Sequence, residues 1–363
     1  MDGPLAIAEA LLAHPTAPYH ERLVADHCLA FGRERGIDAL RDAAGNVVLR
    51  YGTGAAPLVL VAHLDHPGFI VDEVTGDQVT MTFHGGLPAS HAVAGSPVAF
   101  FRPGDDAATG RGALLAADER EGRLTGATAA LLDGEAVPGG IAMWDFPAWQ
   151  LDDGRITSRV CDDLLGAAAI LACLDELQRQ RPDTTVWGLF TRAEEVGFLG
   201  ALEAVRLGTV PEGAPVLSLE CSKALPNAPQ GDGVIVRVGD RMSIFAPALT
   251  ESLRTAADAL ERRDHSFRYQ RKLMDGGACE ATVFCASGFR ASGLAVPLGN
   301  YHNASDDGIG VAPEHVVVDD WLAEIALLIE LGCNRGLLDR ETPGPPSWLR
   351  ERAATARATL GAA

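Results

Sequence analysis

The chain has 363 residues, too many for one small core, so length alone predicts two modules or one large domain with an insertion. Hydrophobic residues make up 47% of it and its mean hydropathy is +0.08, which excludes global disorder. The formal charge of −19 opposes contact with phosphate backbones and anionic lipids, so we expect neither nucleic acid nor membrane as a partner. Apolar runs end well before about 18 residues, and no transmembrane helix is predicted.

The cysteines and the first residues indicate the compartment. Seven scattered cysteines contain no CxxC pair, which is typical of reduced thiols rather than of a disulfide framework. The N-terminal segment MDGPLAIAEA lacks the basic residues with which a secretory signal begins. We therefore expect a cytoplasmic protein.

The first 66 residues predict two helices followed by two strands. Helical spacing covers 5–14 and 20–36, interrupted between them by two prolines and ended by Gly36. A strand is expected at 46–52 after a turn. The continuous apolar run at 56–62 predicts a second strand, buried on both faces in a parallel sheet.

Residues 67–159 have a different pattern. Short runs of alternating polar and apolar residues are separated by Gly, Asp and Pro, and no long helical period appears. Such runs are typical of short antiparallel strands. We predict an inserted, β-rich, barrel-like domain over 67–159.

From residue 160 onward, predicted strands and helices alternate again. Strands are expected at 184–191, 215–220 and 293–299, and helices at 164–180, 200–208, most of 243–264, and 316–333. This pattern predicts an α/β fold, an αβα sandwich with a mostly parallel central sheet, built from 1–66 and 160–340. Residues 341–363 form a predicted C-terminal tail with a proline-rich hinge and a short basic helical stretch.

Side chains that can bind metal follow four of the predicted strands. They are His63 and Asp65 after 56–62, Glu194 and Glu195 after 184–191, Glu220 at the end of 215–220, and His302 after 293–299. In an open α/β sheet, ligands gather at the carboxyl ends of parallel strands. Zinc accepts imidazole and carboxylate together, whereas magnesium and calcium rarely take two histidines. We therefore predict two divalent cations, zinc first, with cobalt or manganese as alternatives.

The residue types also suggest roles within this set. Each metal reaches three or four ligands only if one aspartate serves both, and Asp162, at a helix start, is the candidate. One of Glu194 and Glu195 would bind metal while the other acts as general base and acid. Asp65 is placed to hydrogen-bond the imidazole of His63. For Asp163, an interaction with the helix N-terminus is the expected role.

These motifs resemble those of the co-catalytic dizinc aminopeptidases, and most closely those of the tetrahedral-aminopeptidase family. The matching strings are His63-Leu64-Asp65, Asp162-Asp163-Leu164-Leu165-Gly166, Glu194-Glu195-Val196-Gly197-Phe198-Leu199-Gly200-Ala201, Glu220 and Tyr301-His302. Their order agrees from about residue 5 to 335. The Glu-Glu-Val-Gly string is the most specific element, because His-x-Asp alone would be a weak signal.

The resemblance implies an aminopeptidase that hydrolyses the N-terminal peptide bond of a peptide substrate. It implies Glu194 as base, Asp162 as bridge, Glu195 and His302 as ligands of one metal, and His63 and Glu220 as ligands of the other. It also implies that the insertion over 67–159 is a dimerisation or substrate-access domain, and hence that the protein is a homodimer or a larger homo-oligomer.

Six positions depart from the family pattern. Glu220 and Glu280 stand where aspartate is usual, His66-Pro67 replace Glu-Ile, Leu164 replaces arginine, and Asn303 replaces serine. We expect these residues near the substrate cleft. They leave open an amidohydrolase acting on N-acyl amino acids or other small amides, and a metal-binding scaffold without catalysis. A glycosidase would also use two carboxylates, but without paired histidines.

Overall fold

The computed structural model describes residues 3–338 and 347–360, and its centre is a nine-stranded sheet. The strand order is β1-β2-β12-β3-β13-β17-β15-β16, with β14 paired to β17. The strands are β1 (Asp38–Arg41), β2 (Val47–Tyr51), β3 (Leu58–His63), β12 (Val186–Thr191), β13 (Val216–Ser218), β14 (Cys221–Lys223), β15 (Val234–Asp240), β16 (Tyr269–Met274) and β17 (Ala291–Leu298). The four central strands β12, β3, β13 and β17 run parallel, which confirms the predicted, mostly parallel sheet.

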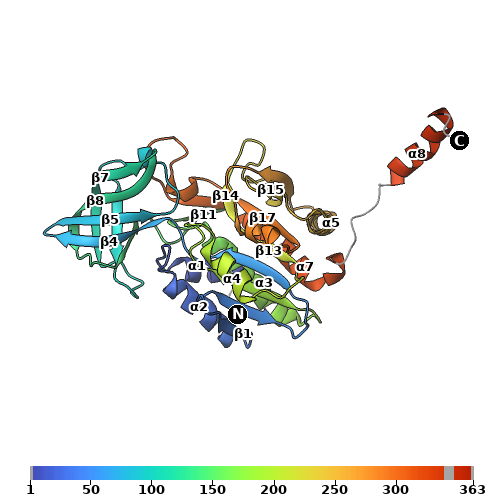
Figure 1. Ribbon diagram of the computed structural model, residues 1–363, viewed down its shortest axis with the longest axis horizontal. Coiled ribbons are helices and arrows are strands. Elements are labelled where there is room, and N and C mark those ends of the chain that lie inside the picture. Colours follow the sequence, from blue (N-terminus) through green and yellow to red (C-terminus); the bar gives the residue numbers. More distant parts are fainter. Residues whose placement is uncertain (1–2, 339–346, 361–363) are drawn as a thin grey trace.

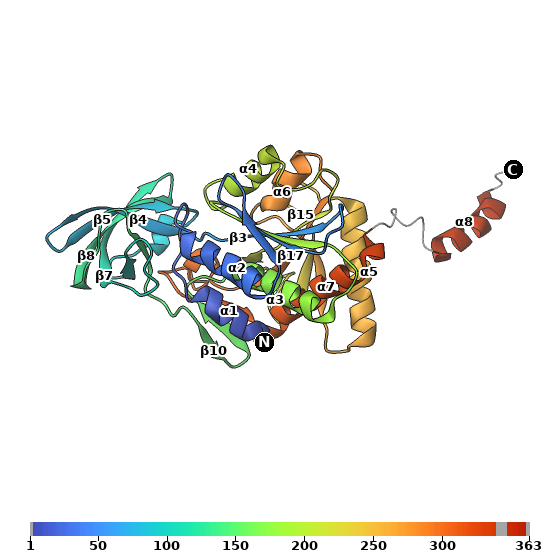
Figure 2. The same cartoon turned by 90° about the horizontal axis from the view of Figure 1, so that it is seen from below.

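Helices cover both faces of this sheet (Figures 1 and 2). On one face lie α1 (Pro4–Leu12), α2 (Arg22–Glu34), α3 (Leu164–Gln180), α5 (Pro247–Arg263) and α7 (Val318–Cys333), and on the other α4 (Leu199–Leu207) and α6 (Glu280–Ala286). Side chains of β3 alternate between the two cores, with Leu58 and Leu60 in the first and Val59 and Val61 in the second. The αβα sandwich is confirmed, and α6 is a helix that the sequence reading did not contain.

A closed six-stranded antiparallel barrel projects from one end of the sandwich (Figure 1). Its strands are β4 (Gly68–Thr75), β5 (Gln78–His84), β6 (Pro97–Phe101), β7 (Gly110–Arg120), β8 (Arg123–Gly134) and β9 (Ile141–Trp144), in the order β4-β5-β8-β7-β6-β9. Phe69 packs edge-on against Phe83 and Trp144, with ring centroids 4.9 and 5.2 Å away. The predicted barrel-like element is confirmed.

A small three-stranded sheet lies at the exit from the barrel. It comprises β10 (Gln150–Asp152), β11 (Arg155–Ser158) and β18 (Glu314–Val317), in that order. Thus β11, inside the predicted insertion, pairs with a strand of the sandwich. The domain limits at 67 and 159 stay predictions.

The predicted tail is described only in part. Helix α8 (Ser347–Leu360) lies apart from the rest of the chain in both views, and 339–346 are outside the described residues (Figures 1 and 2). No helix in the described ranges is long and apolar enough to cross a membrane.

Candidate active site

The parallel strands place the predicted ligands at one edge of the sheet. His63 is the last residue of β3 and pairs with Thr191, the last residue of β12, so the segment holding Glu194 and Glu195 starts beside it. Glu220 lies between β13 and β14. His302 lies in a 3₁₀ turn, Tyr301–Asn303, that follows β17. Because parallel neighbours end at the same edge, residues far apart in sequence meet here.

The two oxygens of Asp162 face two different histidines. Oδ1 lies 3.6 Å from Nε2 of His63, and Oδ2 lies 3.5 Å from Nε2 of His302. Glu195 Oε1 lies 3.0 Å from His302 Nε2, and Glu194 Oε2 lies 4.0 Å from His63 Nε2. His63, Glu194 and Glu195 form one group with potential ligand atoms within 4.8 Å of one another. By the same measure, the five predicted ligands alone form two further, overlapping groups: His63, Asp162 and Glu220, and Asp162, Glu195 and His302. The structure thus brings together all five predicted ligands, with Asp162 in both groups.

Backbone carbonyls fix the orientation of both imidazoles. His63 Nδ1 lies 3.0 Å from the carbonyl oxygen of Asp65, and His302 Nδ1 lies 2.6 Å from that of Gly86. A carbonyl only accepts, so each Nδ1 carries the proton and donates it. In the neutral ring, the lone pair of Nε2 is then left to face the carboxylates, the arrangement of metal-binding histidines.

Several carboxylate oxygens at this edge have no hydrogen-bond partner among the described residues. Asp162 Oδ1, Glu195 Oε1 and Glu220 Oε1 are buried and unsatisfied. Buried polar atoms in proteins are nearly always hydrogen-bonded, so orphaned oxygens beside imidazole lone pairs indicate a cation site. Carboxylates combined with imidazoles form a donor set that fits zinc.

The acid–base properties of the metal-free site agree with this reading. Burial would lower the pKa of His63, but the charges of Glu194 and Asp162 raise it well above its ordinary value. Burial raises the pKa of Glu220 to about 8, assisted by Asp162, and raises that of Glu194 well above its ordinary value. Without cations the cluster therefore holds extra protons, which bound cations would displace.

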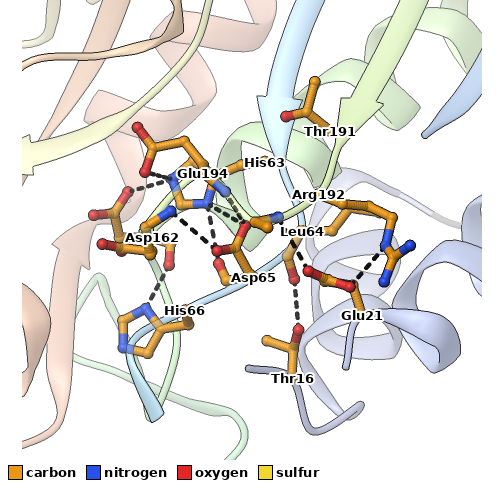
Figure 3. A network of polar contacts seen from close by, with 12 residues as sticks. Thr16, Glu21, His63, Leu64, Asp65, His66, Asp162, Thr191, Arg192 and Glu194 are labelled. Carbon is orange, nitrogen blue, oxygen red and sulfur yellow. Dashed lines mark hydrogen bonds and ion pairs between the residues drawn. The ribbon is translucent and has the colours of Figure 1, made fainter. Parts of the chain in front are cut away.

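Asp65 has a different contact from the one expected. Its backbone carbonyl, not its carboxylate, accepts from the imidazole of His63, and Oδ1 lies 3.7 Å from Nδ1. The carboxylate instead accepts the backbone N–H groups of Glu194 (2.9 Å) and Glu195 (3.0 Å), as Figure 3 shows for Glu194. Asp65 therefore positions the whole Glu194–Glu195 segment as well as the ring.

Glu21 holds the same segment from the other side, a role that was not predicted from the sequence. Its Oε1 accepts the N–H of Ala193 at 3.0 Å, and its Oε2 accepts Nε of Arg192 at 2.8 Å (Figure 3). Ala193 has a positive φ of 53°, a conformation that costs energy outside glycine. The hydrogen bond from Glu21 helps to hold it. Glu21 lies in no recognisable motif, so no sequence signal indicated this role.

Glu314, the first residue of β18, is a second support that sequence reasoning missed. Its Oε2 accepts the backbone N–H groups of Cys161 (2.7 Å) and Asp162 (3.1 Å), and its Oε1 accepts that of His302 (2.8 Å). One buried carboxylate thus joins the segments that carry Asp162 and His302.

Two departures from the family pattern, His66 and Asn303, contact each other. His66 Nδ1 lies 2.6 Å from the carbonyl oxygen of Asp162, and Nε2 lies 3.1 Å from Asn303 Oδ1. The Asn303 amide group donates to the carbonyls of Arg159 and Ala312, which turns Oδ1 toward the ring. Both nitrogens of this buried ring therefore face an oxygen atom.

Two carboxylates beside the motifs, those of Asp163 and Glu280, are buried and have no hydrogen-bond partner among the described residues. Asp163 precedes α3 but forms no capping hydrogen bond, contrary to the expected role, and burial raises its pKa well above its ordinary value. Glu280 at the start of α6 is fully buried, and burial raises its pKa to about 7.

A cleft of about 280 Å³ is lined by the predicted metal ligands, with the barrel as one wall. Gly85, Gly86 and Arg123 line it on the barrel side, and Glu194 lines it together with the predicted ligands. Four of the departing residues were expected here, and none lines it among the described residues: His66, Leu164, Glu280 and Asn303. All four are buried instead. Only Glu220 of the departures reaches the cleft.

Comparisons with known proteins agree with the site. The family model described as M42 glutamyl aminopeptidase matches residues 133–306, which include Asp162, Glu194, Glu195, Glu220 and His302. A curated Escherichia coli (strain K12) protein named "putative aminopeptidase SgcX" is 26% identical over 223 residues. The match covers 54% of this chain and 57% of that protein, so the chain spans little more than half of this relative's length.

Solved structures share the fold. An aminopeptidase from the archaeon Desulfurococcus kamchatkensis matches with a TM-score of 0.76 and 21% identity, over 93% of this chain and 96% of that one. The TET1 peptidase of Pyrococcus horikoshii, described as assembling into a tetrahedron or a large octahedral shell, matches with a TM-score of 0.74 and 17% identity, over 91% and 99%. Together with the family match, these likenesses confirm that the chain resembles the M42 glutamyl aminopeptidases and has the fold of the tetrahedral aminopeptidases.

Proposed function

We propose that this chain is a metal-dependent aminopeptidase that removes the N-terminal residue of peptides. The observation that carries the proposal is the pair of histidines whose Nε2 atoms face opposite oxygens of Asp162. His63 and Glu220 would hold one divalent ion, Glu195 and His302 the other, and Asp162 both. Zinc is the expected metal because the donors combine imidazole with carboxylate.

Two such ions, when bound, would polarise the scissile carbonyl and lower the pKa of the attacking water. Glu194 takes the proton from that water and returns it to the leaving amine. Its position supports this role, since it lines the cleft and its backbone N–H donates to the carboxylate of Asp65. The surrounding carboxylates also favour the cationic amine of a peptide N-terminus.

We also propose that the protein forms a homo-oligomer, with the barrel as a contact between copies. The assemblies named for TET1 support this proposal by analogy of fold. An amidohydrolase acting on N-acyl amino acids would use the same ligands, and so would an inactive metal-binding scaffold. A glycosidase does not account for the two oriented histidines.

The test combines metal analysis with digestion of an unbiased peptide library, with and without a chelator. We expect two ions per chain, release of N-terminal residues, loss of activity with chelator and its return with zinc. Cleavage of N-acyl amino acids alone would favour the amidohydrolase. Two bound ions with no amide hydrolysis would favour the scaffold, and polysaccharide cleavage that survives the chelator would favour the glycosidase.

Glu194→Gln tests the proton carrier. We expect kcat to fall by about 10²–10⁴-fold with metal content unchanged, because the amide cannot accept the proton. Glu212→Gln, on an exposed loop, is the matched control and should retain full activity. Normal turnover by Glu194→Gln would refute the assignment.

A further inference from the structure

Arg123, the first residue of β8, lines the metal cleft from the barrel side. It is exposed, and its guanidinium has no hydrogen-bond or ion-pair partner among the described residues. The carboxylates in the cleft lining are those of the proposed metal ligands and of Glu194, so the proposed site leaves none of them to pair with Arg123. A guanidinium in this position favours an anionic group of the substrate.

Backbone contacts hold Arg123 close to His302, a proposed metal ligand. Nδ1 of His302 lies 2.6 Å from the carbonyl oxygen of Gly86, so the 86–88 segment is joined to the site. Arg123 forms an antiparallel β-bridge with Pro88, in that same segment. The arginine therefore has a fixed place on the barrel wall, next to one of the two ligand groups.

Gly86 keeps the space between these two side chains open. A Cβ at this position would lie 3.6 Å from Nδ1 of His302 and 3.8 Å from Nη1 of Arg123. Both nitrogens are thus within 4 Å of one point on the cleft wall, where glycine places no side chain. An anion bound by the guanidinium would lie beside the ligand group of His302.

The length of a peptide backbone decides which carboxylate can occupy this place. The proposed function puts the scissile carbonyl at the ligand groups. In a dipeptide, only a nitrogen and one Cα separate that carbonyl from the C-terminal carboxylate, a distance of roughly 3–4 Å by standard bond lengths. Each further residue moves the carboxylate about 3.3–3.6 Å farther away and leaves a neutral amide in its place. The position of Arg123 therefore suits the carboxylate of a dipeptide.

The sandwich side of the cleft suits the other half of the substrate. The 276–278 segment lines the cleft there, and Arg241, the second arginine of the lining, donates its backbone N–H to the carbonyl of Gly277 (2.9 Å). This segment and Glu220 also border a smaller hollow of about 70 Å³, which has room for a side chain. An N-terminal side chain placed in that hollow leaves the barrel side of the cleft to the second residue.

We propose that Arg123 binds the C-terminal carboxylate of a dipeptide, which makes the enzyme selective for dipeptides over longer peptides. This selectivity rests on the proposed function, because the scissile bond must lie at the ligand groups. It concerns the residue after the cleaved bond rather than the N-terminal residue. An N-acyl amino acid carries its carboxylate at the same distance from its amide bond, so the contact would also serve the alternative amidohydrolase.

Three substrates that share one scissile bond test the selectivity: leucyl-alanine, its C-terminal amide and leucyl-alanyl-alanine. In the metal-loaded protein, we expect kcat/KM for leucyl-alanine to exceed the other two values by about 10-fold. A hydrogen bond to a charged group contributes more than that when buried, but solvent screens an exposed arginine. Equal values for leucyl-alanine and either of the others would overturn the inference.

Arg123→Gln should bring the ratio of kcat/KM for leucyl-alanine and its amide close to 1. Arg123→Lys should keep part of the ratio, because the charge remains without the planar fork. Arg120→Gln is the matched control, since this exposed arginine pairs with Arg123 across the β7–β8 hairpin but does not line the cleft. It should leave the ratio unchanged, and so should Arg241→Gln. An unchanged ratio in Arg123→Gln, or an equal loss in either control, would contradict the contact.

Calorimetry makes the result independent of turnover. In the metal-loaded Glu194→Gln protein, which should not consume the substrate, leucyl-alanine should bind about 10-fold more tightly than its amide, and adding Arg123→Gln should remove the difference. Should the unaltered protein cleave N-acetyl-leucine but no peptide, this preference would uphold the contact while the proposed function fails. Cleavage of leucyl-alanine and its amide at equal rates, with equal affinities, would leave the proposed function standing and refute the contact.

Discussion

The barrel and the carboxyl edge of the central sheet use burial in opposite ways. The barrel buries apolar side chains on alternate positions, as in β5, where Gln78, Thr80 and Thr82 are exposed while Val79, Met81 and Phe83 point inward. Among the described residues, no buried side-chain nitrogen or oxygen between 68 and 144 lacks a partner. At the sheet edge, by contrast, Asp162, Glu195 and Glu220 each have a buried carboxylate oxygen with no hydrogen-bond partner among the described residues.

This difference separates a region built for stability from one built for binding. A satisfied apolar interior contributes to folding whatever else is present. Orphaned carboxylates and oriented imidazoles reduce the stability of the empty site and strengthen the binding of whatever completes them. Substitutions in the two regions should therefore affect different observables.

The largest effect is expected from Asp162→Asn. An amide cannot serve two cations as a bridging carboxylate does, so metal content should fall and kcat/KM should drop by at least about 10³-fold. Asp163→Asn is the matched control, because burial already favours the uncharged form of that carboxyl. Elemental analysis and kinetics check both variants. Full metal content in Asp162→Asn would show that Asp162 is not a metal ligand.

Phe100→Ala tests the barrel. Phe100 is 1% exposed in the barrel core, and its truncation should lower the free energy of unfolding by about 3–5 kcal/mol with metal stoichiometry unchanged. Leu132→Ala, at a residue 70% exposed on β8, should change stability by less than about 0.5 kcal/mol. Loss of metal at temperatures where Phe100→Ala is folded would show that the two regions are not independent.

His66→Gln tests whether His66 holds the segment of Asp162 in place at the proposed metal site. Glutamine cannot donate to the Asp162 carbonyl and to Asn303 with the geometry of a ring, so metal affinity should fall by about 10–100-fold. Competition with a chelator measures this, with the exposed His265→Gln as control. An unchanged affinity would assign His66 to packing alone.

Glu324→Met should show the smallest effect, and in the opposite direction. Both carboxyl oxygens of Glu324 are buried and have no hydrogen-bond partner in the described ranges, and burial raises the pKa of this carboxyl well above its ordinary value. Replacing it with an apolar side chain of similar volume should stabilise the chelator-treated protein by about 1–3 kcal/mol. Glu9→Met, on the exposed face of α1, should be neutral in thermal denaturation. A lower Tm for Glu324→Met would mean that the carboxyl is satisfied.

Much of the fold and of the ligand set follows from local sequence. The run at 56–62 and the helical period at 164–180 depend on neighbouring residues, so β3 and α3 were predicted within about two residues. Short elements lack such periodicity, which is why α6 was missed. The pairing of β11 with β18 joins segments far apart in the chain, and spacing alone does not encode it.

The sequence by itself determined which chemical groups end the buried strands, because strand length and side-chain type are local properties. Only the tertiary structure decided how those groups are aimed. Asp65 contacts His63 through its carbonyl, and Glu314 reaches Cys161 across 153 positions of the chain. Hydrogen-bond partners depend on where packed elements meet, and that is settled only when the whole chain has folded.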